Sequence, residues 1–439
     1  MAVILTWGIT RYKECRKEIA IVEELRADNV KIKRLPLTTF EKILGERFTK
    51  QSWEVNLDAQ PEHLERLSKL ERVNSIRARG GDLTNLAAFS KLANLESLEL
   101  VGAWQLKTLV GIEHLQNLRI FELGDAWRVT TARPLASLKK LEELSFFHHD
   151  GNTCSFEDLD EVLHELTGLK SFVAYECPVR SLDAFENCKN LERLELWLDG
   201  AGITSLDGLV GLPIQKLDLS DPGEIEDWTP LGSMTELTDL RISTCHTNSL
   251  EFLPRLKKLK SLDLSLSHQS LTRDGKTLGE ALEPMLLPQL EKLRIPSLEL
   301  VTLDEKFSLE RFTQLRELTI REDRFQGTME ELNAYFADPD KYDLTADWPE
   351  LKLSRLKNMP SLRKLRLVGV PRLTSLDGIE SLGMLNEVQL RGCPDLSDIR
   401  MLQQLASLDK VDIFFCQKIP PQQITNLKAA SPKTEIIAQ

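Results

Sequence analysis

Residues 92–123 read LANLESLELVGAWQLKTLVGIEHLQNLRIFEL, and this stretch decides the fold of the chain. The apolar pattern LxxLxxLxL occurs in it twice, and the second copy follows the first after 23 residues. The apolar positions of the two copies are Leu92, Leu95, Leu98 and Leu100, then Leu115, Leu118, Phe121 and Leu123. A fixed period of this size is typical of repeat proteins, in which each repeat buries its apolar face against its neighbours.

Further copies of the pattern can be followed along the chain by the last apolar residue of each. These fourteen residues are Ala78, Leu100, Leu123, Phe146, Ala174, Leu196, Leu219, Ile242, Leu264, Ile295, Ile320, Leu367, Leu390 and Ile413. Nine of the thirteen spacings between them are 22 or 23 residues. The LxL part has the period of two expected of a strand with one buried face, and apolar groups further on are spaced as in a helical turn. We therefore predict one strand and one short helical element per repeat.

Segments such as ITSLDGLVGL, LTSLDGIESLGML and LSDIRMLQQLASL resemble the leucine-rich-repeat family. The resemblance covers most of the chain and is to the short-repeat subtype, which includes a phosphatase regulator and the repeat regions of bacterial internalins. It implies an α/β solenoid of horseshoe form with caps at both ends. A parallel sheet of about 14 strands is implied on the concave side, and short 3-10 or α elements on the convex side.

One departure from the family pattern concerns the Asn that often follows the strand. That place holds Cys177, Cys245, Cys393 and Cys416 in four repeats, and Cys188 occupies an apolar place of its own repeat. Cysteine is a substitute for this Asn in the family, and a small, weakly donating thiol suits a buried turn. Five of the seven cysteines are therefore expected to lie in the core.

The pattern divides the chain into three parts. Residues 1–57 do not fit the repeat, so we expect an N-terminal cap in which AVILTW is a strand, ECRKEIAIVEELRA a helix and SWEVNLDA a strand. Residues 58–427 are the predicted solenoid, and residues 428–439 are the predicted C-terminal cap. Within the first part, LPLTTFEKILGERF resembles the opening of an F-box, a helical motif that binds adaptor proteins.

Three interruptions break the period. We predict that SFEDLDEVLHEL is a helix with Ser155 as its N-cap and acidic residues in its first turn. The segment SHQSLTRDGKTLGEALEPMLLP is predicted to be another, longer helix. The third interruption is the excursion at 321–358, whose aromatic residues argue against disorder.

Composition restricts the class of protein. The net charge of −12 argues against general affinity for nucleic acid, and no apolar run approaches the about 18 residues that cross a bilayer. The apolar start lacks a basic segment before it and a cleavage site after it, so no signal peptide is expected. An odd number of cysteines favours reduced thiols. We expect a cytoplasmic protein that is monomeric in isolation and binds neither membranes nor nucleic acid.

Few residues suggest catalysis or metal binding. The densest group of metal-ligand types is His148, His149, Asp150, Cys154 and His164. Adjacent strand residues point to opposite faces, and no pair in this group has zinc-finger spacing. The DGKT at 274–277 resembles the end of a phosphate-binding loop, but Ser270 stands where that loop needs a glycine. We expect no catalytic residue, no metal and no cofactor.

The residues between the buried positions of each strand should form columns across the concave face. In one column, consecutive repeats place Phe147, Tyr175 and Trp197 side by side. Aromatic residues are enriched among binding hot spots, so this strip is a candidate anchor for a partner. The alternative is that the rings pack against one another or lie under the loop at 148–154. Acidic candidates for meeting basic groups stand in the next column: Glu99, Glu122, Glu195 and Asp218.

The later repeats are predicted to present a basic concave face. The candidate binding residues there are Arg294, Arg321, Arg366 and Arg391. Together with Lys292, Lys364 and Lys410 they outnumber the acidic residues Glu317, Glu387 and Asp412. A charged run is usually a solvated face, but a change of sign along one surface can orient a partner and speed its encounter.

The sequence thus favours a non-enzymatic scaffold that binds a protein partner on its concave face and regulates or inhibits it. Control of an enzyme and neutralisation of a toxin are two versions of this hypothesis. The alternative is a ubiquitin-ligase-type adaptor, or an injected bacterial effector, that recruits an enzyme through the N-terminal region. An effector would be secreted from its cell without a cleaved signal peptide.

Overall fold

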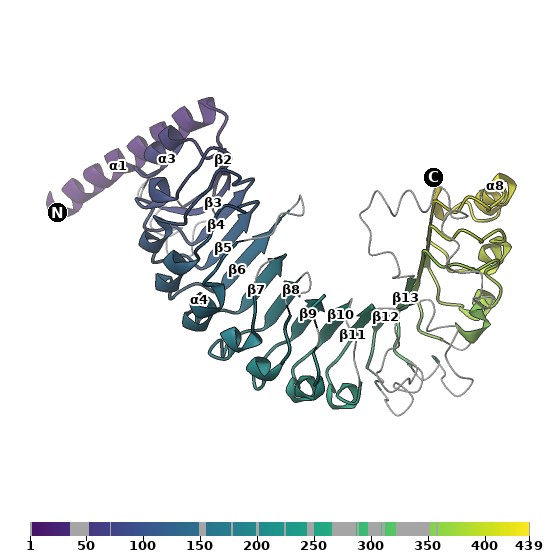
Figure 1. Ribbon diagram of the computed structural model, residues 1–439. Coiled ribbons are helices and arrows are strands. Elements are labelled where there is room, and N and C mark those ends of the chain that lie inside the picture. Colours follow the sequence, from purple (N-terminus) through teal and green to yellow (C-terminus); the bar gives the residue numbers. More distant parts are fainter. Residues whose placement is uncertain are drawn as a thin grey trace. The chain divides into compact units, whose positions relative to one another are not determined.

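The structure is a computed structural model of the 439-residue chain. It describes all residues except 1, 36–51, 71, 149–154, 177–178, 199–201, 224, 244–249, 266–286, 288, 297–308, 310–311, 322–351, 357–358 and 439. The chain divides into two compact units, Met1–Ile214 and Gln215–Gln439. Within each unit, strands follow one another side by side and short helical elements lie on one side of them (Figure 1).

The first unit contains eight of the described strands. They are β1 (Lys31–Arg34), β2 (Trp53–Asp58), β3 (Val73–Arg79), β4 (Ser97–Val101), β5 (Ile120–Gly124), β6 (Glu143–Phe147), β7 (Ser171–Tyr175) and β8 (Arg193–Trp197). Its helices are α1 (Ala2–Ala27), α3 (Pro61–Leu67) and α4 (Leu159–Glu165). Its 3-10 helices are η2 (Ala87–Phe89), η3 (Ile112–His114), η4 (Arg133–Ser137), η5 (Leu182–Phe185) and η6 (Asp207–Leu209). β1 pairs with β2 antiparallel, and the strands from β2 to β8 pair in chain order and parallel.

The second unit continues the same pattern. Its strands are β9 (Lys216–Ser220), β10 (Asp239–Ser243), β11 (Ser261–Ser265), β12 (Lys292–Pro296), β13 (Glu317–Arg321), β14 (Lys364–Val368), β15 (Glu387–Arg391), β16 (Lys410–Phe414) and β17 (Glu435–Ala438). Its helical elements are η7 (Thr229–Ser233), η8 (Leu253–Arg255), η11 (Leu353–Leu356), η12 (Ile379–Ser381), η13 (Arg400–Gln404) and α8 (Pro421–Ala430). All nine strands pair in chain order and parallel.

The predicted repeat fold is confirmed. The fourteen predicted strands are β3–β16, and the last apolar residue of every copy is buried in its strand. From β4 to β16 that residue is the fourth of a five-residue strand, so the copies are in register. The three further strands of the structure, β1, β2 and β17, lie in the regions predicted to be caps. The boundaries proposed for those caps stay a prediction.

The core of each repeat stacks on the core of the next because the strands pair without a shift. In the first unit Phe146 contacts Phe156 and Phe172, with ring centroids 4.9 and 6.1 Å apart. Phe172 in turn lies 5.3 Å from Phe185. All four rings are fully buried, and each such side chain contributes about 1.5–3 kcal/mol relative to an exposed one. The repeat therefore folds by burying its apolar stripe against its neighbours.

A glycine in the segment LVGI (109–112) lets neighbouring turns stack closely. Gly111 precedes η3 with φ of 111°. A Cβ atom added there would lie 2.4 Å from the backbone nitrogen of Ala87 in the preceding repeat. Any side chain at this position would therefore push two repeats apart, in addition to the strain of a left-handed backbone.

The N-terminal prediction is partly wrong. ECRKEIAIVEELRA is helical and SWEVNLDA contains β2, as predicted, but AVILTW forms the start of α1 rather than a strand. No proline interrupts the run from Ala2 to Ala27, so the helix continues through a segment whose composition favours a strand. The sheet is instead extended by β1, which pairs with β2. Among the described residues, no helix is long and apolar enough to span a bilayer.

The helix predicted over SFEDLDEVLHEL is shorter than expected. It begins at Leu159, so Ser155 is not its N-cap, and the Ser155 hydroxyl donates to the carbonyl of Trp127 at 3.1 Å. Asp158 is the N-cap residue by position, yet its carboxylate accepts from Thr131 Oγ1 at 2.6 Å and from the Ala132 nitrogen at 2.7 Å. The acidic residue thus ties the helix to the preceding repeat.

Several predictions concern residues outside the described ones. These are the helix over SHQSLTRDGKTLGEALEPMLLP, the F-box-like segment LPLTTFEKILGERF and most of the excursion at 321–358.

Candidate functional site

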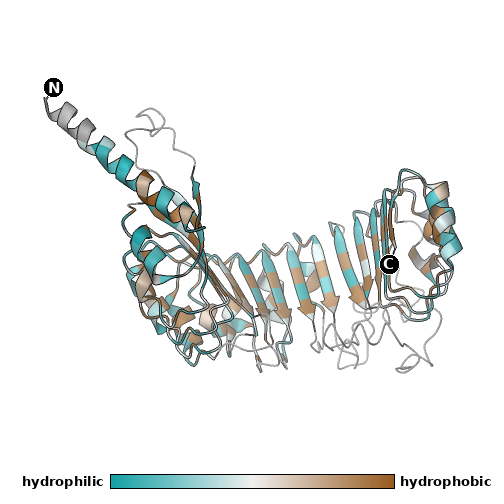
Figure 2. Ribbon diagram, turned by 90° about the horizontal axis from the view of Figure 1, so that it is seen from above, coloured by the Kyte–Doolittle hydropathy of each residue, from teal (hydrophilic) through white to brown (hydrophobic). Residues whose placement is uncertain are grey.

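In each of the two units, the predicted binding residues, eleven in all, lie on the same face of the strands. In the repeat strands β4–β16 this face is formed by the first, third and fifth residues, and it is called the open face below because the core lies on the other side. Figure 2 shows the alternation of hydrophilic and hydrophobic residues along the strands. The first unit carries Glu99, Glu122, Phe147, Tyr175, Glu195 and Trp197. The second unit carries Asp218, Arg294, Arg321, Arg366 and Arg391.

The three residues of the predicted aromatic strip form two separate contacts, one between Tyr175 and Trp197 and one between Phe147 and Gly124. Tyr175 and Trp197 are opposite each other on β7 and β8, and their rings meet edge to face with centroids 4.8 Å apart. Trp197 nevertheless keeps 42% of its surface exposed. Phe147 leans the other way and covers Gly124, because a Cβ atom at that glycine would lie 2.4 Å from Phe147 Cε2. The packing alternative is thus realised for Tyr175 and Trp197, but the indole stays accessible.

The predicted acidic column is only partly neutralised. Glu99 accepts from Arg77 Nε at 3.0 Å, and Glu195 accepts from Arg193 Nε at 2.9 Å. Glu122, on the strand after Glu99, forms no ion pair with any residue that the structure describes. Within the described part of the chain, the column therefore holds a carboxylate that has no ion-pair partner.

The surroundings of Glu122 penalise its negative charge. Partial burial raises the pKa of the Glu122 carboxyl, and the nearby carboxylates of Glu99 and Glu143 raise it further. The positive charges of Arg77 and Arg193 oppose this only in part. Sequence reasoning missed Glu143, which stands at the first position of β6. Its place on the open face could have been read from the same register.

Asp218 was predicted to extend this acidic column, but it belongs to a different arrangement in the second unit. The third residues of β9–β12 alternate in sign along the sheet: Asp218, Arg241, Asp263 and Arg294. Arg241 lies 3.4 Å from each of the two aspartates, and Arg294 Nη1 lies 3.1 Å from Asp263 Oδ2. Asp218 also accepts from Ser220 Oγ at 3.1 Å. This ion-pair ladder satisfies the charge of Asp218 and of Arg294.

The lysines of the later repeats are also paired. Lys292 lies 3.7 Å from Glu317, Lys364 forms an ion pair with Glu387, and Lys410 lies 3.5 Å from Asp412. This pairing lowers the net positive charge of the face, on which the candidate arginines Arg321, Arg366 and Arg391 lie on the adjacent strands β13–β15. The Nε atom of Arg366 is buried without a hydrogen-bond partner in the described structure. Sequence alone overestimated the basic character of this face because it could not show the pairing between strands.

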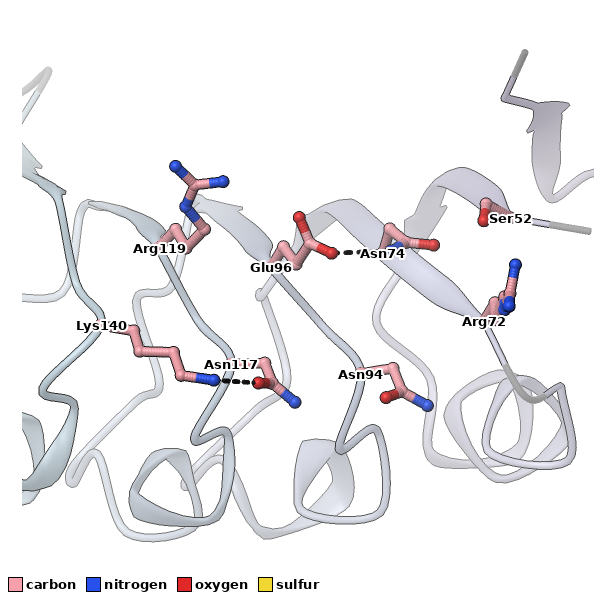
Figure 3. Close-up of a pocket in the computed structure, with 8 residues that line it drawn as sticks. All are labelled: Ser52, Arg72, Asn74, Asn94, Glu96, Asn117, Arg119 and Lys140. Atoms are coloured by element: carbon pink, nitrogen blue, oxygen red, sulfur yellow. Dashed lines mark hydrogen bonds between the residues drawn. The ribbon is translucent and has the colours of Figure 1, made fainter. Parts of the chain in front are cut away.

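A polar cavity lies at the amino-terminal ends of β3–β5, and sequence reasoning did not predict it. It encloses about 510 Å³ and is lined by Ser52, Arg72, Asn74, Asn94, Glu96, Asn117, Arg119 and Lys140 (Figure 3). Asn74 donates to Glu96 at 3.0 Å and Lys140 to Asn117 at 2.7 Å. Arg119 is bound to Glu142 at 2.8 Å. Several of its polar groups are thus paired with one another or with Glu142, which makes this cavity a weak candidate.

The side chains of His164 and Cys188 are held by hydrogen bonds within the repeats. His164 Nε2 lies 2.8 Å from Asn187 Nδ2, and among the described residues no three potential ligands could hold a metal ion. Burial raises the pKa of the Cys188 thiol to about 11, and its Sγ donates to the carbonyl of Leu166 at 3.6 Å. Cys393 and Cys416 are buried as predicted. Cys154, Cys177 and Cys245 lie outside the described residues.

No protein-family model matches the chain, and no curated protein matches it by sequence. Solved structures match it by fold. A leucine-rich-repeat protein of Leptospira interrogans has a TM-score of 0.51 and 16% identity, over 87% of this chain and 99% of that one. An internalin of Listeria monocytogenes has a TM-score of 0.48 and 19% identity, over 77% of this chain and 86% of that one.

A third similar structure is TLR13 in a complex with ssRNA13. It has a TM-score of 0.45 and 16% identity, over 87% of this chain and 59% of that one. Identities this low show the fold alone. The Leptospira similarity and the parallel, in-register strands together show that the chain has the leucine-rich-repeat fold.

Proposed function

We propose that this chain is a non-enzymatic scaffold that binds a basic segment of a protein partner on the open face of its first unit. The observation that carries the proposal is the accessible edge-to-face pair of Tyr175 and Trp197. It lies on the strands that follow the incompletely neutralised carboxylates of β5 and β6. Aromatic anchors and unpaired charge thus occur in one half of the chain.

The aromatic pair supports the proposal through its geometry. Tyr175 holds the Trp197 ring by an edge-to-face contact, so the indole is fixed before a partner arrives. A fixed side chain loses little conformational entropy on binding, and covering its exposed part removes apolar surface from water. Tryptophan and tyrosine in such positions dominate many interfaces.

The carboxylates support the basic character of the partner. The raised pKa of Glu122 means that its negative charge is unfavourable in the free protein. A lysine or arginine of a partner placed between Glu122 and Glu143 would supply the missing positive charge. Attraction of this kind raises the association rate as well as the specificity. A partner whose basic segment is itself functional would be inhibited while it is held.

Partner capture by variants tests the proposal. The double variant Tyr175→Ala and Trp197→Ala is compared with the unaltered chain in pull-downs followed by mass spectrometry, and captured proteins are then titrated. Phe415→Ala is the control, because Phe415 is an aromatic residue of the second unit with 43% exposure, close to the 42% of Trp197. The double variant should lose partners that the control retains. Equal capture by both, with intact folds, would remove the aromatic pair from the proposal.

The N-terminal region offers a second candidate function, recruitment of an enzyme as an adaptor or effector would do it. Tyr12 and Ile19 of α1 favour it, because both are large side chains with about two fifths of their surface exposed (41% and 40%). The variant Tyr12→Ala with Ile19→Ala distinguishes the two functions. Loss of capture by this variant, but not by the aromatic-pair variant, would favour the adaptor function.

A further inference from the structure

A second cavity of the first unit lies at the carboxyl-terminal ends of β2–β5, and it belongs to neither the aromatic pair nor the acidic column. It encloses about 510 Å³. Its lining comes from the last residues of β2, β3 and β4, from the loops that follow them, and from Asp125 directly after β5. Four separate segments therefore build it, at the border of the proposed binding face.

One wall of this cavity is the indole of Trp104, which is 49% exposed. The ring lies over Gly102, because a Cβ atom at that glycine would be 3.3 Å from Trp104 Cζ2. Gly102 has φ of 64°, a conformation that suits glycine. Because Gly102 has no side chain, the indole packs directly against its backbone, and the outer surface of the ring stays accessible. An exposed tryptophan face attracts cations.

The other walls carry negative charge. Among the described lining residues, Asp58, Asp82 and Asp125 are acidic and Arg79 is basic. Asp58 and Asp82 are exposed, whereas Asp125 retains only 6% exposure. Acidic groups therefore outnumber basic ones three to one in this cavity.

Asp125 occupies the place at which the preceding repeat has Gly102. Its φ is 59°, in the left-handed region that costs a non-glycine residue about 1 kcal/mol. Its Oδ2 accepts from the Gly102 nitrogen at 3.2 Å, which fixes the carboxylate beside Trp104. A nearly buried carboxylate that accepts a backbone hydrogen bond and an indole that lies on a glycine thus line one cavity.

We propose that this cavity is a subsite for an arginine side chain of the protein partner. The partner that supplies the arginine is the one inferred under the proposed function, and the subsite names one part of its chemistry. A guanidinium group can stack on the Trp104 indole and donate two parallel hydrogen bonds to a carboxylate. An anion would meet three carboxylates, so it does not fit. A metal ion does not fit either, because no described group of side chains could hold one.

The test uses a small probe, so it does not need the partner. N-acetyl-argininamide is titrated into the full chain labelled with ¹⁵N, and the indole N–H signals of the seven tryptophans are followed by NMR. Trp104→Phe identifies the Trp104 signal. N-acetyl-citrullinamide is the matched control, because citrulline has the shape of arginine without its charge. The Trp104 signal should shift saturably with the arginine probe and at least about fivefold less with citrulline at equal concentration.

Variants of exposed lining residues sharpen the test without disturbing the fold. Asp82→Asn should weaken binding of the arginine probe roughly threefold to fivefold, since it removes one partly screened attraction. Arg79→Ala should strengthen binding by a similar factor, because it removes the competing positive charge. Lys107→Ala, on an exposed residue that does not line the cavity, should leave binding unchanged.

Three outcomes would overturn the subsite. They are no saturable shift of the Trp104 signal, an equal shift with citrulline, and a shift with N-acetylglutamate that depends on Arg79. Each can be told apart from failure of the proposed function. Partner capture that depends on Tyr175 and Trp197 does not require the probe to bind, and probe binding does not require those two residues.

Discussion

The open faces of the two units are built on repeat strands of the same length and register, yet charged residues are arranged on them in opposite ways. In the second unit, opposite charges alternate from strand to strand, as in Asp218, Arg241, Asp263 and Arg294. In the first unit, Glu99 and Glu122 follow each other with the same sign. The fold fixes where these side chains stand but not which charges they carry. The two faces therefore differ in the charges that the sequence places on them and not in the positions of those side chains on the strands.

In the ladder of the second unit, each charged side chain has an oppositely charged neighbour on an adjacent strand. Each exposed ion pair contributes only about 0–1 kcal/mol, but a pair that neutralises a nearly buried carboxylate prevents a larger penalty. Like charges on neighbouring strands raise the free energy of the free protein and are relieved only by an added cation. We therefore expect changes in the second unit's ladder to alter stability, and changes in the first unit's face to alter binding.

The largest expected effect is on binding by the first unit. Trp197→Ala should weaken the captured partner's affinity by about 2 kcal/mol or more, roughly thirtyfold, which is the size of a hot-spot residue. The thermal unfolding temperature should change little because Trp197 is 42% exposed. Isothermal titration of both proteins measures the effect. Trp197→Phe is the matched control and should retain most of the affinity, so an equal loss there would argue against an aromatic anchor.

The next effect tests the opposite behaviour of the second unit. Arg241→Ala removes the cation between Asp218 and Asp263, so the nearly buried Asp218 keeps the hydrogen bond from Ser220 but loses this positive charge. We expect a loss of about 1–2 kcal/mol in the free energy of unfolding, measured with urea. Partner affinity should stay unchanged.

Lys258→Ala is the control for that experiment. Lys258 pairs with Glu236 at 2.6 Å, but both side chains are about half exposed (56% and 50%). Its loss should therefore change stability by less than about 1 kcal/mol. If Arg241→Ala is equally harmless, the ladder is a solvated surface and the contrast between the units loses its energetic basis.

The third effect tests the packing of Phe147 against Gly124. Gly124→Ala would place a Cβ atom 2.4 Å from the Phe147 ring, so the ring must move. We expect destabilisation of about 1 kcal/mol, at the low end of overpacking costs because Phe147 is only partly buried. In the background Phe147→Ala the same change should cost less. A cost that is identical in both backgrounds would mean that Gly124 is needed for its backbone and not for the ring.

Much of this architecture can be predicted from the sequence, because two sequence periods determine the positions of the strands and of their exposed residues. The 23-residue repeat and the alternation within each strand put Glu99, Glu122 and Tyr175 on the open face without any coordinates. The start of α1 could not be read in this way. AVILTW is apolar without a clear period, and continuity with the following helix decided its structure.

The pairing of charges was harder to foresee than their position. Arg193 binds Glu195 on its own strand, whereas Arg241 binds aspartates on both neighbouring strands. Which of these a long, flexible side chain chooses depends on rotamers and on burial, and neither has a sequence period. The cavity beside Trp104 was missed for a related reason, because four separate segments contribute to its walls.

The smallest effect concerns the charge of Glu122 and depends on pH. Its pKa is raised in the folded protein, mainly by burial and then by Glu99 and Glu143, so the folded state holds this proton more tightly than the unfolded state. Below the ordinary glutamate value of 4.5 both states are protonated and the residue is neutral in its effect. As the pH rises from there through the folded-state pKa, stability is lost, and it stays lower above it.

Glu122→Gln should therefore raise the unfolding temperature slightly at neutral pH and leave it unchanged below the ordinary glutamate pKa. The gain is small because solvent screens a partly exposed group. Glu99→Gln is the control, since Glu99 already has Arg77 at 3.0 Å and should show no gain. Thermal melts of both variants at the two pH values decide the matter. A rise in the unfolding temperature of Glu122→Gln that persists at low pH would show that the negative charge of Glu122 does not destabilise the first unit.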